Sequence, residues 1–333
     1  MAQDKLIGKL SDDHVMSCSR LPALFGMSPW SSPNDELQKS MKAWDAVQDG
    51  RDPRADRTAA GEAAYWGNEL EDTILVEGAK RLGLDINTQV TERFDHAEIE
   101  LQGSMDGILQ GDGRVIEHDP SAGIYVMDGP SIVLDGPGVA EAKLTRASAL
   151  DVPAAYRGPV QVQGLMMCSG YQWAAIFTLY QGTELRIYLC GKDAAMQSKI
   201  REDVIDFDAR MELYTTQNLA EWYPALSPND AASAYAKPEN DLPAVQFDNE
   251  HSQLVMDLIA AKAAEKASKK LVDAVSTRLM DYIGMHPKGI AKDDDGNVFA
   301  EVAWPMSSPR KAFSVEAKPA ARAKSLRVKE VTL

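Results

Sequence analysis

The stretch VAEAKLT, residues 139–145, carries an acid and a base two positions apart, Glu141 and Lys143. Its other residues are small or apolar, which favours a β-strand. Residues two apart in a strand project from the same face, so Glu141 and Lys143 share one face and only alanine and leucine occupy the other, as beneath a packed helix. A solvated edge strand with an ion pair would show the same pattern. The surrounding sequence distinguishes a functional site from such an edge.

Composition sets broad limits on the kind of protein. The 333 residues suffice for one large domain with additions or for two domains, and 44% of them are hydrophobic. Apolar runs are too short for a membrane helix, and the first residues lack the apolar core of a signal peptide, so we expect a cytoplasmic protein with no membrane partner. Three scattered cysteines make a thiolate metal site or a disulfide framework unfavourable.

The charge is strongly negative overall, with a formal net charge of −15. This argues against non-specific coating of nucleic acid but allows a local basic channel or a carboxylate site for a divalent metal. Residues 310–333 are an exception, because they form a basic tail.

Periodicity predicts both helices and strands along the chain, and therefore an α/β protein. We expect a core over residues 1–225, a proline-rich linker over 226–248, and a C-terminal helical and β-hairpin extension over 249–333 that ends in the basic tail. The hairpin turn at Asp295-Gly296 suits type I′. The expected helices cover residues 11–50, 61–82, 158–170, 193–216 and 249–284, and the expected hairpins or strands cover 110–138, 139–145, 172–191 and 290–304.

Asp106 ends a strand-like segment upstream of VAEAKLT, beside a glycine turn in GSMDG. A strand-borne aspartate followed by a strand with Glu-x-Lys is the pattern of the PD-(D/E)xK nuclease core. Asp106, Glu141 and the Ala142 carbonyl offer the oxygen ligands that Mg²⁺ prefers. Lys143 could orient or deprotonate the water that attacks a phosphodiester. The pattern alone is weak.

Further motifs surround this pair of segments. WGNELE supplies Glu71 on a helix, and VQVQG supplies Gln161 and Gln163 on the helix after VAEAKLT. Glu71 could equally be a solvated helix residue, and the glutamines could cap a helix or hydrogen-bond in the core. Trp30 and Trp66 could stack on a base, although core packing is the favoured interpretation.

Together the motifs resemble the YqaJ-like viral recombinases, a lambda-exonuclease-like family of the PD-(D/E)xK superfamily. Their order and rough spacing agree over residues 14–216. The matching segments are Ser17 to Gly26, Gly67 to Glu71, Ser104 to Gly107, Glu141 to Lys143 and Gln161 to Gln163.

The resemblance implies a restriction-endonuclease-like core, with a mixed central sheet flanked by helices, and an Mg²⁺-dependent 5′→3′ exonuclease on linear double-stranded DNA. Such an enzyme leaves single-stranded 3′ overhangs for phage or prophage recombination in the bacterial cytoplasm. It implies two Mg²⁺ ions per site, with Mn²⁺ as a substitute, a single-strand annealing recombinase as partner and a ring-shaped trimer. The alternatives are a structure-specific DNA endonuclease of the same superfamily and a non-catalytic module that binds DNA ends.

The resemblance also assigns roles to residues. Asp106, Glu141 and the Ala142 carbonyl would bind the first metal ion, and Glu71 would assist at a second. Lys143 would be catalytic, with Gln161 contacting the nucleophile or the lysine. The predicted catalytic residues are therefore Lys143, Glu141, Asp106, Gln161 and Glu71.

A weaker prediction concerns the 5′-phosphate of the DNA end. The family's arginine before the serine motif has no counterpart in this sequence, so we expect Ser17, Ser19 and Arg20 to bind this phosphate at a helix start, with Arg20 or a basic residue elsewhere supplying the positive charge. The alternative for Ser19 is an ordinary helix cap or a hydroxyl on the helix surface.

Overall fold

The computed structural model describes residues 12–53, 61–236 and 243–303. Chain contacts divide it into two units, one ending at Tyr235 and the other beginning at Ala236. This division falls within the predicted linker 226–248. The basic tail of residues 310–333 lies outside the described residues.

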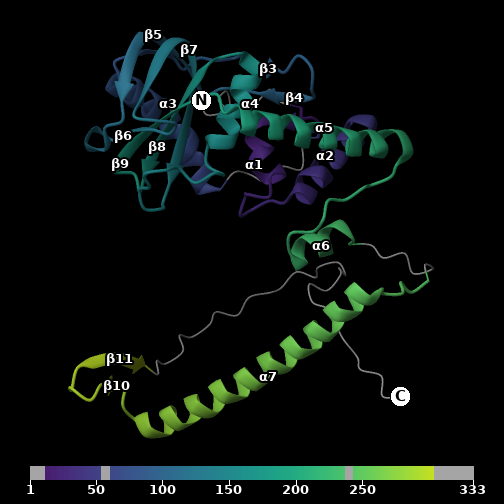
Figure 1. Ribbon diagram of the computed structural model, residues 1–333, viewed down its shortest axis with the longest axis vertical. Helices are drawn as coiled ribbons and strands as arrows, with labels where there is room; N and C mark the ends of the chain where they lie inside the picture. The colour runs from purple at the N-terminus through teal and green to yellow at the C-terminus, as the bar shows by residue number, and fades with distance from the viewer. Residues whose placement is uncertain (1–11, 54–60, 237–242, 304–333) are drawn as a thin grey trace. The chain divides into compact units, whose positions relative to one another are not determined.

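The first unit is built on a six-stranded mixed sheet (Figure 1). β7 pairs in parallel with β8 and antiparallel with β5, so the strand that carries Glu141 and Lys143 is central. Residues 141–145 extend beyond β5 and pair only with β8, but Glu141 is buried, so the interpretation of VAEAKLT as a solvated edge strand is wrong. In spatial order the strands are β2 (Asp85–Asn87), β5 (Gly107–Glu117), β7 (Ser131–Thr145), β8 (Trp173–Tyr180), β9 (Glu184–Gly191) and β6 (Ile124–Val126).

Helices cover both faces of this sheet, as expected for the restriction-endonuclease-like core that the resemblance implies. On one face α3 packs against the even-numbered residues of β7, and on the other face α4 and its neighbours pack against the odd-numbered ones. The helices of this unit are α1 (Leu21–Leu24), α2 (Pro33–Gln48), α3 (Glu62–Leu82), α4 (Pro159–Ser169), α5 (Ala194–Gln217) and α6 (Pro228–Ala234), with short 3₁₀ segments at η2 (Cys18–Arg20) and η3 (Pro120–Ala122).

A glycine lets α3 lie close to the sheet. A Cβ at Gly78 would come within 2.3 Å of the Phe177 ring, so any larger residue would push the helix away. Ile74 and Leu75 of α3 are buried in the same cluster as Ala140 of β7. The alanine face of VAEAKLT is therefore covered by a helix, and this prediction is confirmed.

The N-terminal segment differs from the single helix expected over residues 11–50. β1 (Met16–Ser17) pairs in parallel with β4 (Leu101–Gly103), which also pairs with β3 (Phe94–Asp95). The strand interrupts the helical pattern because its partner lies some 85 positions away along the chain, which local periodicity cannot reveal. α2 begins at a capping box, in which the Ser32 hydroxyl accepts from the Asp35 N–H and the Asp35 carboxylate accepts from the Ser32 N–H.

The second unit contains a long helix, α7 (Asn249–Ile283), and a hairpin of β10 (Lys288–Lys292) and β11 (Val298–Ala303). The hairpin confirms the prediction, but its turn is not type I′, because Gly296 has a positive φ and Asp295 does not. None of the helices in the described ranges combines the length and hydrophobicity that a membrane-spanning segment needs.

Candidate active site

The candidate site lies where β5 stops pairing with β7. The β5 register ends with Gly107 opposite Ala140, and β7 continues beyond that point to Thr145. Asp106 immediately precedes β5, and its Oδ2 accepts a hydrogen bond of 3.0 Å from the backbone N–H of Ala142. The N–H and C=O of one strand residue point to the same side, so the Ala142 carbonyl faces the opening that Asp106 borders.

Glu141 is almost fully buried, with 2% of its surface exposed. Its Oε1 accepts a hydrogen bond from Lys143 Nζ at 2.5 Å, whereas the buried Oε2 has no hydrogen-bond partner among the described residues. A buried carboxylate oxygen without a partner is costly. A bound divalent cation would satisfy it, so this donor set fits the predicted metal.

Lys143 connects the strand to the helix that follows it. Its Nζ donates to Gln161 Oε1 at 3.0 Å as well as to Glu141. Burial alone would lower the pKa of Lys143, but the negative charges of Glu141, Asp106 and Glu71 outweigh it and raise the pKa above the usual value. Lys143 is therefore a cationic hydrogen-bond donor at neutral pH.

Gln161 reaches Lys143 because α4 begins abruptly at Gly158. Gly158 has a φ of +112°, a region that favours glycine, and it is the N-cap of α4. Gln161 then falls in the first helical turn and is buried. The structure thus brings Asp106, Glu141, Lys143 and Gln161 together.

Glu71 lies near this group without completing a cluster of three carboxylates. Its charge acts on Lys143, which places it on the same side of the site. Within residues 12–53, 61–236 and 243–303, no three His, Cys, Asp or Glu residues are grouped to hold a metal ion. The metal-ligand roles of Asp106, Glu141 and the Ala142 carbonyl stay predictions, as does the second-metal role of Glu71.

Gln163 has a structural role instead. Its Nε2 donates to the Gly191 carbonyl at 2.8 Å, and its Oε1 accepts from the Asp193 N–H and from Gln197 Nε2, both at 3.0 Å. It ties α4 to the end of β9 and to the start of α5. The core-hydrogen-bond alternative therefore describes Gln163, and the site role belongs to Gln161.

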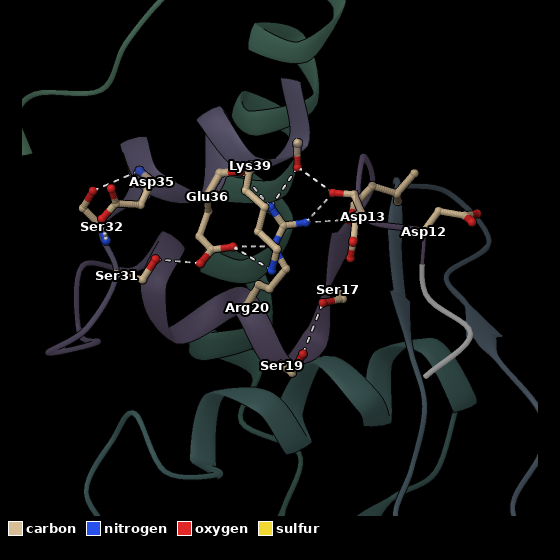
Figure 2. A network of polar contacts seen from close by, with 12 residues as sticks. Asp12, Asp13, Ser17, Ser19, Arg20, Ser31, Ser32, Asp35, Glu36 and Lys39 are labelled. Atoms are coloured by element: carbon tan, nitrogen blue, oxygen red, sulfur yellow. Dashed lines mark hydrogen bonds and ion pairs between the residues drawn. The ribbon is translucent and has the colours of Figure 1, made fainter. Parts of the chain in front are cut away.

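Arg20 is enclosed by protein groups (Figure 2). Its Nε donates to Glu36 Oε2 at 2.5 Å, and Nη2 donates to the Glu36 carbonyl and to Ser40 Oγ, both at 2.8 Å. Nη1 donates to the carbonyls of Asp13 and Val15. With 7% of its surface exposed and its nitrogens engaged, Arg20 holds the N-terminal segment against α2. This differs from the phosphate-binding role expected from the sequence.

The two serines of the same segment are placed differently from each other. Ser17 is buried, Ser19 is exposed, and their hydroxyl oxygens are 3.2 Å apart (Figure 2). Ser19 makes no side-chain cap of η2 or α1, so the cap alternative does not describe it. A phosphate role for Ser19, supported by Ser17, stays a prediction.

Two tryptophans are more exposed than the sequence suggested. Trp30 is 71% exposed and Trp66 is 49% exposed, so the core-packing interpretation is wrong for both. Trp66 is on α3, five residues before Glu71, and its Nε1 donates to Glu62. Trp30 precedes α2 and contacts the loop after β7.

The mixed sheet and its site define a PD-(D/E)xK-type protein: a central strand carries Glu-x-Lys, and an aspartate stands at the start of the neighbouring strand. The predicted fold class is confirmed. Residues 12–172 match the family described as the YqaJ-like viral recombinase domain. The predicted resemblance to this family is therefore confirmed over this segment of the chain.

Two solved structures are similar at greater distance. An alkaline exonuclease (LHK-Exo) from Laribacter hongkongensis is 17% identical, with 60% of this chain and 89% of that chain covered and a TM-score of 0.42. A phage-related exonuclease from Haemophilus somnus 129PT is 15% identical, with 62% and 96% covered and a TM-score of 0.41. These likenesses are too distant to assign a function. No protein with a curated description matches the sequence.

Proposed function

We propose that the chain is a divalent-metal-dependent exonuclease that degrades linear double-stranded DNA from the 5′ end and leaves 3′ overhangs for phage-type recombination. The observation that carries the proposal is the buried Oε2 of Glu141, which has no partner among the described residues and lies in a site with Asp106 and a cationic Lys143. The match of residues 12–172 to the viral recombinase family supports DNA as the substrate.

Asp106, Glu141 and the Ala142 carbonyl would hold Mg²⁺, or Mn²⁺ in its place. The cation supplies Lewis-acid polarisation of the scissile phosphate and offsets charge on its oxygens. A second ion near Glu71, an annealing recombinase as partner, a trimeric ring and a bacterial cytoplasmic setting remain parts of the proposal that follow from the resemblance alone.

Lys143 contributes through its hydrogen bonds. An ammonium group has three N–H donors, and Glu141 and Gln161 accept two of them in this structure. The third is left to orient the attacking water or to bind a phosphoryl oxygen where negative charge develops. Orientation of the water and its deprotonation both remain open as roles for Lys143.

The experiment is hydrolysis of end-labelled linear duplex DNA in Mg²⁺. Lys143→Met keeps much of the apolar stem and removes the donors, so we expect cleavage to fall by about 100-fold or more, the range seen for loss of one such donor. Lys80→Met, at an exposed lysine that pairs with Glu77, is the matched control and should cleave normally. Label at the 5′ end should be released before label at the 3′ end.

Cleavage by Lys143→Met at the wild-type rate would overturn the proposal. Absence of cleavage by the wild type with intact DNA binding would favour the end-binding module instead.

A further inference from the structure

Two aromatic rings and an arginine meet beside the candidate active site. The rings of Trp30 and Tyr156 lie edge to face, with centroids 5.2 Å apart and planes at 82°. The Arg157 guanidinium carbon is 5.5 Å from the Trp30 centroid and 5.2 Å from the Tyr156 centroid. We refer to Trp30, Tyr156 and Arg157 as the aromatic platform.

The platform is exposed where a folded protein would normally cover it. Trp30 is 71% exposed, and Leu150 and Val152, on the loop that leads to Tyr156, are 44% and 68% exposed. Neighbouring exposed apolar side chains of this size mark interaction surfaces, whereas single ones are ordinary. Tyr156 and Arg157 support the Trp30 ring from one side and leave most of it open.

Arg157 is available for a ligand. Among the described residues it has no ion pair and no side-chain hydrogen bond, and its buried Nε lacks a partner. Other arginines of the first unit, such as Arg20, Arg186 and Arg210, are paired with carboxylates. An uncommitted guanidinium in a chain with 50 acidic residues favours a polyanion as its ligand, and stacking on aromatic rings keeps the group in place.

The space that Trp30 lines suits a base more than a phosphate. A hollow of about 360 Å³ is bordered by Trp30, Pro29 and Leu226, with hydroxyl and carboxylate groups from Ser31 and Asp35. It contains no lysine or arginine among its lining residues. A phosphate would meet no cationic lining residue in this hollow. A nucleobase offers an apolar face for Trp30 and amino groups that can donate hydrogen bonds to these oxygens.

The platform is near the site along the chain. Arg157 directly precedes Gly158, and Gln161, which binds Lys143, is in the first turn of α4. Four residues of helix span about 6 Å along the axis. Successive stacked nucleotides of one strand are about 3.4 Å apart. A strand with a phosphate at Lys143 would therefore bring a base to the platform within a few nucleotides.

We propose that Trp30, Tyr156 and Arg157 bind an unpaired nucleobase of single-stranded DNA a few nucleotides from the phosphate at Lys143. The proposal rests on the nuclease function, because it requires that a strand enter the site with a phosphate at Lys143. Leaving the duplex breaks stacking, and an aromatic ring restores part of it with little regard to sequence.

The test is equilibrium binding of a fluorescent oligothymidylate without divalent cation, followed by anisotropy. Trp30→Leu keeps apolar bulk and removes the ring, so its Kd should rise by about 5-fold to 150-fold, the range for one stacked base. Trp30→Phe keeps a ring and should bind nearly as tightly as the wild type. The exposure of Trp30 means that neither variant should change the melting temperature, which is measured alongside.

An abasic oligonucleotide of equal length carries the same phosphates without bases. The wild type should bind it more weakly than oligothymidylate, and Trp30→Leu should weaken this binding no further. Equal loss on both oligonucleotides, or wild-type affinity of Trp30→Leu for oligothymidylate, would overturn the platform. Competition by free thymidine monophosphate as effective as the oligonucleotide would also overturn it, in favour of a mononucleotide site.

The binding assay separates this inference from the nuclease function. It needs neither metal nor cleavage. Ring-dependent binding by a protein that never cleaves linear duplex in Mg²⁺ would refute the nuclease and leave the platform intact. Normal cleavage with ring-independent binding would refute the platform alone.

Discussion

Replacing Arg20 with alanine should lower the free energy of unfolding by about 3–5 kcal/mol, the usual loss when one member of a buried ion pair is removed. The change leaves Glu36 as a buried negative charge. It also removes the guanidinium N–H groups that donate hydrogen bonds to the Ser40 hydroxyl and to the carbonyls of Asp13 and Val15. For a unit of this size, about 2–4 °C of melting temperature corresponds to 1 kcal/mol, so we expect a fall of roughly 6–20 °C.

Thermal unfolding at neutral pH measures this loss of stability, and a solvent-exposed ion pair serves as the control. Glu77 and Arg81 form an ion pair on the surface of α3, where solvent screens the charges, so Glu77→Gln should leave the melting temperature almost unchanged. Glu36→Gln should resemble Arg20→Ala, because it leaves the buried guanidinium without its charge partner. A melting temperature for Arg20→Ala within the range of the Glu77 control would refute the structural role and restore Arg20 as a candidate phosphate ligand.

The same pair predicts a pH dependence. Burial tends to raise the pKa of Glu36, but the positive charge of Arg20 and the Ser31 hydroxyl outweigh it, so the pKa is lowered. A lowered folded-state pKa contributes stability above the unfolded value, near 4.3 for glutamate, and this stability is lost as the pH falls through the folded value. The stability difference between wild type and Arg20→Ala should therefore shrink at acid pH.

Three further variants test the rest of the site. Asp106→Asn keeps an acceptor for the Ala142 N–H but is a poorer metal ligand, so calorimetry should show weaker Mg²⁺ binding with an unchanged melting temperature; unaltered affinity would contradict the assignment. Gln163→Leu removes the hydrogen bonds to the Asp193 N–H and the Gly191 carbonyl and should lower stability by about 0.5–1.5 kcal/mol per lost bond, as measured by urea unfolding, whereas a neutral result would remove its structural role. Ser19→Ala should reduce any preference for 5′-phosphorylated over 5′-hydroxyl duplex by about tenfold, the effect of one charged hydrogen bond; equal rates on both ends in the wild type would end the phosphate prediction.

Local pattern was sufficient for the central strand. Strand alternation placed Glu141 and Lys143 on one face and the alanines beneath a helix, and both placements are confirmed by β7 and α3. The family resemblance implied that Asp106 and Gln161 would converge there, and they do. These features depend on period and order along the chain, which the sequence displays directly.

Features that depend on distant partners were not predictable in this way. The environment of Arg20 is set by Glu36 and Ser40 on another helix, so its sequence neighbours gave a misleading role. β1 exists because β4 pairs with it, and Trp30 is exposed because of where its loop lies. No local pattern identified Tyr156 and Arg157 as its partners, since no periodicity links positions that meet only in the folded chain.

The central claim is tested most directly by comparing linear and covalently closed circular duplex DNA of one sequence, each with and without Mg²⁺. The account predicts that the wild type degrades the linear form only when Mg²⁺ is present, that it leaves the circle intact, and that Glu141→Gln degrades neither. Degradation of the closed circle would contradict the exonuclease and favour a structure-specific endonuclease, and degradation of linear DNA by Glu141→Gln at the wild-type rate would remove the site itself.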